Sequence, residues 1–61
     1  MKPKQIIRNT LAGTLREARR MRRYMWENKM EARYNLAGAY ARLFLYYSRK
    51  ADDLRVALKG V

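Results

Sequence analysis

Apolar and small residues in the first half of the chain recur with the period of an α-helix. At 100° per residue, a set of seven falls within one arc of about 120°. Its members are Ile7, Leu11, Thr14, Leu15, Ala18, Met21 and Met25. Pro3 precedes them, and the fixed φ of proline suits the first turn of a helix. The pattern predicts an amphipathic helix over about residues 4–27.

A second apolar stripe follows in the C-terminal half of the chain. It contains Leu36, Tyr40, Leu43, Tyr47, Leu54 and Leu58, with Phe44 and Ala51 on its flank. Lys59 and Gly60 come next, a cation that favours the negative end of the helix dipole and a residue typical of helix ends. These residues predict a helix over about residues 31–58. A break near residues 48–53 is an alternative, because a serine and two aspartates there are suited to cap a new start.

The segment between the two stripes determines whether the chain forms a helical hairpin or one long helix. Asn28, Lys29 and Arg33 interrupt the apolar pattern, which favours a turn at about residues 28–30 and an antiparallel hairpin of two helices. No glycine or proline marks this turn, so one long continuous helix is the alternative. Such a helix would be supported by a rotated stripe, formed by Trp26, Met30, Tyr34, Ala37, Ala41 and Phe44. We expect an all-α single module comprising residues 1–61, with the hairpin preferred.

The short chain has few ways to stabilise its fold. A domain of 61 residues hides only about 60% of the surface that its unfolded form exposes. It has no Cys and no His, so we expect no disulfide, metal site or cofactor. Association remains, which predicts a homo-oligomer or a subunit of a larger complex. The residues expected at helix–helix contacts, within the chain or between chains, are Leu36, Tyr40, Leu43, Phe44, Leu45, Tyr47, Leu54, Val56 and Leu58.

The strong positive charge changes the expected class of partner. Fifteen Lys and Arg face five Asp and Glu, a net charge of +10, and Arg outnumbers Lys ten to five. Arginine grips phosphate and carboxylate groups with a planar fork of donors. The expected contacts to nucleic acid or an acidic partner lie opposite the first apolar stripe: Arg8, Arg16, Arg19, Arg20, Arg22 and Arg23. Tyr24, Trp26 and Tyr46 are expected to add aromatic contacts, because exposed aromatic rings can stack on unpaired bases.

These features favour a non-enzymatic protein that binds nucleic acid without sequence preference, within an oligomer or larger nucleoprotein assembly. Catalysis is not expected, since the chain lacks His, Cys and a glycine-rich phosphate loop. One alternative is a protein-binding adaptor, inhibitor or small structural subunit, such as a viral one, that docks on an acidic and apolar protein surface. Another is a helix lying on an anionic membrane surface.

The chain shows no signal for export or membrane insertion. Its start lacks the apolar run and cleavage site of a secretory signal, which predicts a cytoplasmic location or a place within a virion or nucleoprotein particle. The most apolar stretch, residues 34–47, is shorter than the roughly twenty residues that span a bilayer. No transmembrane segment is therefore expected.

Overall fold

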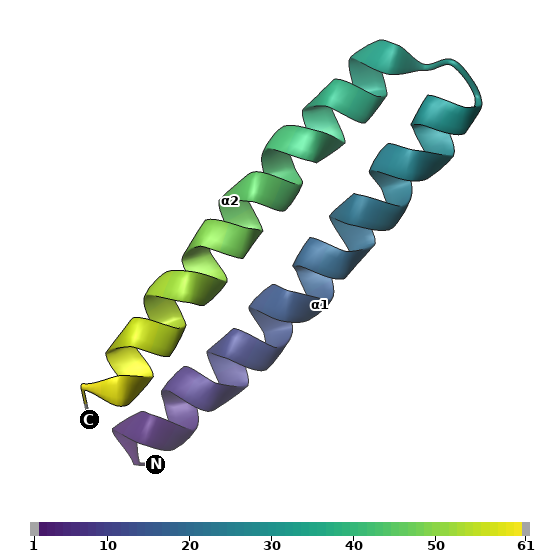
Figure 1. The fold of residues 1–61 in the computed structure, drawn as a ribbon. Helices are drawn as coiled ribbons and strands as arrows, with labels where there is room; N and C mark the ends of the chain where they lie inside the picture. The colour runs from purple at the N-terminus through teal and green to yellow at the C-terminus, as the bar shows by residue number, and fades with distance from the viewer. Residues whose placement is uncertain (1, 61) are drawn as a thin grey trace.

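The computed structural model describes residues 2–60, which form two antiparallel helices (Figure 1). α1 comprises Pro3–Met30 and α2 comprises Tyr34–Lys59. The helices lie side by side, with the turn at one end and, at the other, the start of α1 and the end of α2. The all-α hairpin is thus confirmed, and the continuous helix is wrong. α2 also runs without a break through residues 48–53.

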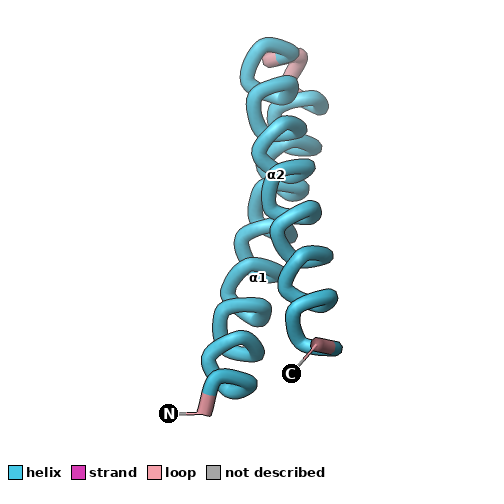
Figure 2. The backbone as a smooth tube through the Cα atoms, turned by 90° about the vertical axis from the view of Figure 1, so that its left-hand side faces the viewer, coloured by secondary structure: helices cyan, strands magenta, loops and turns pink. Residues whose placement is uncertain are grey.

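The helices pack through residues that repeat every seven positions, the spacing of a two-stranded coiled coil. In α1 the central series is Ile7, Thr14, Met21 and Asn28, and in α2 it is Ala37, Phe44, Ala51 and Leu58. Viewed from the side, the helices cross at a shallow angle (Figure 2). The buried residues among those described are small or flexible, and they are Thr14, Ala18, Met21, Ala37 and Ala51.

The predicted apolar stripe of α1 packs on α2. All seven of its members are buried or half-buried. Thr14, the one polar member, is buried at 6% exposure, and its hydroxyl donates a hydrogen bond to the carbonyl oxygen of Thr10 at 2.8 Å. The hydroxyl is thereby satisfied within its own helix, so it can lie at the interface without loss of a hydrogen bond.

The predicted stripe of α2 is rotated away from the true interface. Leu36 and Leu43, two members of that stripe, are 48% and 41% exposed. The packed side is centred on Ala37 and Ala51, which lie 7% and 1% exposed. Small side chains allow the two helix backbones to approach closely, so α2 turns its alanines inward and leaves the two leucines outside. Leu36 and Leu43 therefore lie mostly outside the contact between α1 and α2, and their expected place at a helix–helix contact stays a prediction.

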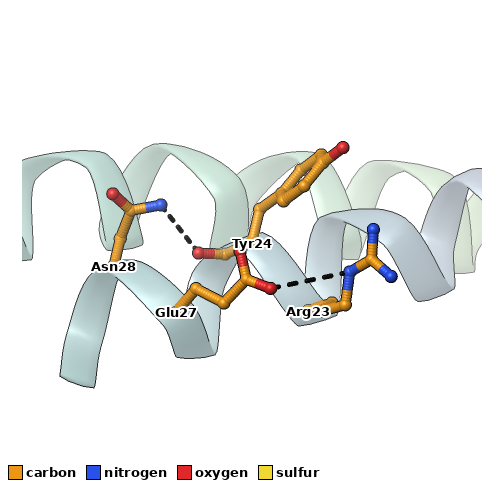
Figure 3. Close-up of polar contacts among 4 residues, drawn as sticks. All are labelled: Arg23, Tyr24, Glu27 and Asn28. Carbon is orange, nitrogen blue, oxygen red and sulfur yellow. Dashed lines mark hydrogen bonds and ion pairs between the residues drawn. The ribbon is translucent and has the colours of Figure 1, made fainter. Parts of the chain in front are cut away.

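The turn occupies residues 31–33 and not the expected residues 28–30. α1 ends in a Schellman motif, in which the Arg33 N–H donates to the Asn28 carbonyl at 2.8 Å and the Ala32 N–H donates to the Lys29 carbonyl at 3.1 Å. Ala32 adopts the left-handed conformation that this motif requires, with φ of 60°. The polar side chains before it do not end the helix. Asn28 instead donates to the Tyr24 carbonyl at 2.8 Å, one turn earlier (Figure 3).

Candidate anion-binding surface

The outer side of α1 carries a dense group of cations, here called the arginine face. Its members are Arg8, Arg16, Arg19, Arg20, Arg22 and Arg23, and all are exposed. Because positions three, four and seven apart share one side of a helix, the spacing alone gathers four of them. These four border a shallow depression of about 380 Å³: Arg16, Arg19, Arg20 and Arg23. The structure thus brings the sequence-predicted arginines together on one element.

Only part of this charge is neutralised within the chain. Arg20 pairs with Glu17 at 3.2 Å, and Arg23 pairs with Glu27 at 3.7 Å (Figure 3). Within residues 2–60 the other four members have no carboxylate at ion-pair distance, and they are Arg8, Arg16, Arg19 and Arg22. Exposed ion pairs on a helix contribute only about 0.3–0.5 kcal/mol each. The arginine face is therefore available to an external anion.

The positive surface continues from α1 onto α2 along a groove of about 250 Å³. The floor of the groove is apolar and includes Leu15, Ala18, Phe44 and Ala51. Its rim carries Arg19 and Arg22 from α1 and Arg55 from α2. Arg55 donates a hydrogen bond to Asp52 at 3.0 Å, which keeps its guanidinium over this side of α2. Asp52 also lines the groove and pairs with Arg55 at 3.0 Å, so the second helix adds a guanidinium whose charge is balanced by its neighbouring carboxylate.

Arg55 was missed in the sequence, although a signal for it exists. It follows Ala51 by four residues and so lies on the same side of α2. Once Ala51 is known to be at the centre of the interface, Arg55 must lie at its edge. The predicted stripe of α2 includes Leu36, Leu43 and Leu54, and Arg55 lies off that stripe.

The three candidate aromatic contacts have different surroundings. Tyr24 is half-buried, and its ring packs on that of Tyr40 with 5.3 Å between centroids. Trp26 is exposed and follows Arg19 by seven residues, so it lies on the side of the arginine face. Tyr46 is exposed on α2, where its ring packs edge-on against Tyr47 at 5.2 Å. Arg23 lies over the Tyr24 ring at 5.5 Å, and the Lys29 ammonium lies over the Trp26 ring at 4.8 Å, so both rings are already in contact with cations of the chain.

The remaining predicted contact residues of α2 have two kinds of environment. Those half-buried on the side of α1 are Tyr40, Phe44, Tyr47, Leu54 and Leu58. Leu45 and Val56 are exposed and face away from α1. The expectation that Leu45 and Val56 contact another chain stays a prediction.

Neither described helix contains an apolar stretch of the length that a bilayer crossing requires. Comparison with known proteins finds no matching family model, no matching curated protein and no matching solved structure. Function is therefore inferred from the chain's own geometry and charge.

Proposed function

We propose that this protein is a non-enzymatic module that binds nucleic acid without sequence preference through its arginine face. The observation that carries the proposal is the set of four exposed arginines on one side of α1 that have no ion-pair partner within residues 2–60. Such cations displace counterions from a phosphate backbone, and the released counterions drive binding that weakens steeply as salt rises.

The dimensions of α1 suit a polyanion. Arg8 and Arg23 lie fifteen positions apart, which corresponds to about 22 Å along a helix. That length matches roughly six steps of a nucleic-acid strand at 3.4 Å per phosphate. A small anion would engage one or two of these arginines, whereas a strand can engage most of them at once. The extended arrangement therefore favours a polymer of phosphates.

The side chains beside the arginines support contact with phosphates and not with bases. Asn and Gln are the usual readers of adenine, and arginine reads guanine through two parallel hydrogen bonds to the base edge. Gln5 and Asn9, which flank Arg8, are engaged with each other through a 3.0 Å hydrogen bond. Contacts to phosphates position a protein but carry no sequence information. We therefore expect similar affinity for unrelated sequences.

Paired charge-removing variants test the proposal. Arg16→Gln with Arg19→Gln removes two members of the arginine face, and Arg42→Gln with Arg49→Gln removes the same charge from the outer side of α2. Binding to a random duplex is measured by fluorescence anisotropy at several salt concentrations. The wild type should give a log–log salt slope of about −5 if six phosphates are contacted. The first variant should reduce this slope by about two and weaken binding at least tenfold, with a smaller change in the second.

Two results would contradict the proposal. Failure of the wild type to bind duplex or single strand at low salt would remove nucleic acid as the partner. Equal losses in the two variants would show that net charge alone drives binding and that the arginine face has no special role.

A second candidate function is docking on an acidic and apolar protein surface. The exposed side chains Leu45, Tyr46 and Val56 on the outer side of α2 favour it, since they lie near Arg42 and Arg49. Capture experiments with and without nuclease separate the two functions, because a protein partner is retained after nuclease treatment and a partner bridged by nucleic acid is lost.

A further inference from the structure

The hairpin has two broad faces, and they differ in chemistry. One contains the groove between Arg22 and Arg55. On the opposite face the Tyr24 and Tyr40 rings meet across the helices at 5.3 Å. Residues at multiples of seven from these tyrosines, or four before that series, share their side of each helix. We call this second side the neutral face, and it comprises Ile6, Thr10, Gly13, Glu17, Arg20, Tyr24, Glu27, Leu36, Tyr40, Leu43, Tyr47, Lys50, Leu54 and Ala57.

The charges on the neutral face cancel. It carries two cations, Arg20 and Lys50, and two carboxylates, Glu17 and Glu27. Arg20 is paired with Glu17 at 3.2 Å, and Glu27 is paired at 3.7 Å with Arg23, a border residue whose guanidinium lies over the Tyr24 ring at 5.5 Å. In a chain of net charge +10, this is the side on which another strongly cationic molecule can approach with the least repulsion. It is also a poor surface for a polyanion.

The neutral face is rich in apolar surface that the hairpin does not cover. Ile6 and Leu36 are each 48% exposed, and Leu43 is 41% exposed. Beside them Tyr40, Tyr47 and Leu54 are only half-buried. Both helices contribute, so the apolar surface forms a broad face and not a single stripe. Paired helices in four-helix bundles present such a face to the second pair.

The chain exposes more surface than a compact monomer of the same mass. The chain exposes 4992 Å², whereas a compact monomer of its mass of 7.3 kDa exposes about 4200 Å². The elongated shape of the hairpin, with Cα extents of 45 × 15 × 11 Å, contributes to this excess of about 800 Å², which is of the size that one partner buries in a standard stable interface.

We propose that a second copy of this chain docks on the neutral face to form a four-helix bundle with a two-fold axis. Both copies then bury the same surface, as the symmetry of such dimers requires. Arg20, which belongs to both faces, lies at the edge of the contact, and the other members of the arginine face lie on the outer sides of the bundle. The dimer does not depend on nucleic acid, and it holds whether or not the arginine face binds phosphate.

Sedimentation equilibrium of the nuclease-treated protein tests the dimer directly. At about 0.5 M NaCl, where charge repulsion is screened within a few ångströms, the wild type should be a dimer at micromolar concentrations. Leu43→Lys should raise the dimer dissociation constant at least tenfold, because a lysine would be buried against the partner. Leu45→Lys makes the same change at a leucine that is 62% exposed on the other side of α2, and it should leave the dimer intact.

A monomer throughout the concentration range, or equal weakening by the two substitutions, would overturn the proposal. Circular dichroism of the variants checks that both remain helical. Thermal unfolding of the wild type gives an independent readout that needs no variant, since the midpoint of a dimer rises with protein concentration. A midpoint that does not change over a hundredfold range of concentration would also overturn it.

Discussion

At the scale of single residues, Ala32 has the least favourable backbone conformation in the hairpin. It adopts φ of 60° in the turn, at the position where helix ends most often place glycine. The left-handed conformation costs an L-residue with a Cβ about 1–2 kcal/mol. The two hydrogen bonds of the Schellman motif, from Ala32 and Arg33 to the last turn of α1, hold the residue there.

Ala32→Gly should therefore stabilise the hairpin by about 1 kcal/mol, because glycine adopts this conformation without steric cost. For a chain of this size that corresponds to a rise in melting temperature of roughly 4–8 °C. Ala12→Gly, at an exposed position inside α1, is the matched control and should destabilise by about the same amount. Circular dichroism melts measure both. A lower melting temperature for Ala32→Gly would show that the turn does not use this motif.

At the scale of the elements, the existence of the helices could be predicted more readily than their rotation or their ends. The period of apolar residues predicted α1 and its packed side because its interface residues are mostly apolar. In α2 the interface uses Ala37 and Ala51, whose weak hydrophobic signal is outweighed by the exposed Leu36 and Leu43. The end of α1 was missed because an alanine occupies the position where glycine would have marked it.

The residues of the candidate site could also be predicted only in part. The six arginines of the arginine face could be predicted, because they lie within one helix whose period fixes their side. The contribution of Arg55 could not, since it depends on how α2 is rotated against α1. The ligand of this surface remains a proposal, because cations on a helix indicate an anion without specifying which one.

A substitution at Gly38 tests whether this position of α2 is free of packing contacts. A Cβ added there would meet no atom within 4 Å, so its absence serves no packing purpose inside the hairpin. Gly38→Ala should stabilise the protein by about 1 kcal/mol, the helix-propensity difference between the two residues. Urea unfolding measures the change. A loss of stability would indicate that the site is covered in solution.

Ala51→Val is expected to change stability in the opposite direction. Ala51 is 1% exposed, and two added methyl groups would push the helices apart, with an expected loss of about 1–3 kcal/mol. Similar effects for Gly38→Ala and Ala51→Val would contradict the packing described here.

At the scale of the whole molecule, net charge opposes the fold. The charge of +10 is confined to a body with Cα extents of 45 × 15 × 11 Å, so each cation has several others within a Debye length at low salt. The four ion pairs within residues 2–60 are all exposed and offset little of this repulsion.

Added NaCl should therefore raise the melting temperature. Raising the salt from about 0.02 M to 0.3 M shortens the screening length severalfold, which weakens repulsion among the cations more than it weakens the few ion pairs. Scanning calorimetry measures the midpoint. The variant carrying Arg42→Gln and Arg49→Gln has two fewer charges and should respond less. A midpoint that falls with salt would show that the ion pairs dominate.

The start of α1 and the end of α2 lie at the same end of the hairpin (Figure 1). The distance between them therefore reports whether the hairpin is open or closed. Packed helices lie about 8–10 Å apart, so two dyes joined to the two ends would transfer excitation energy almost completely while the hairpin is closed. An unfolded chain of this length separates its ends several times farther, and the transfer would fall. Energy transfer in single molecules would thus report how often the hairpin opens, and whether a phosphate polymer or a second copy holds it closed.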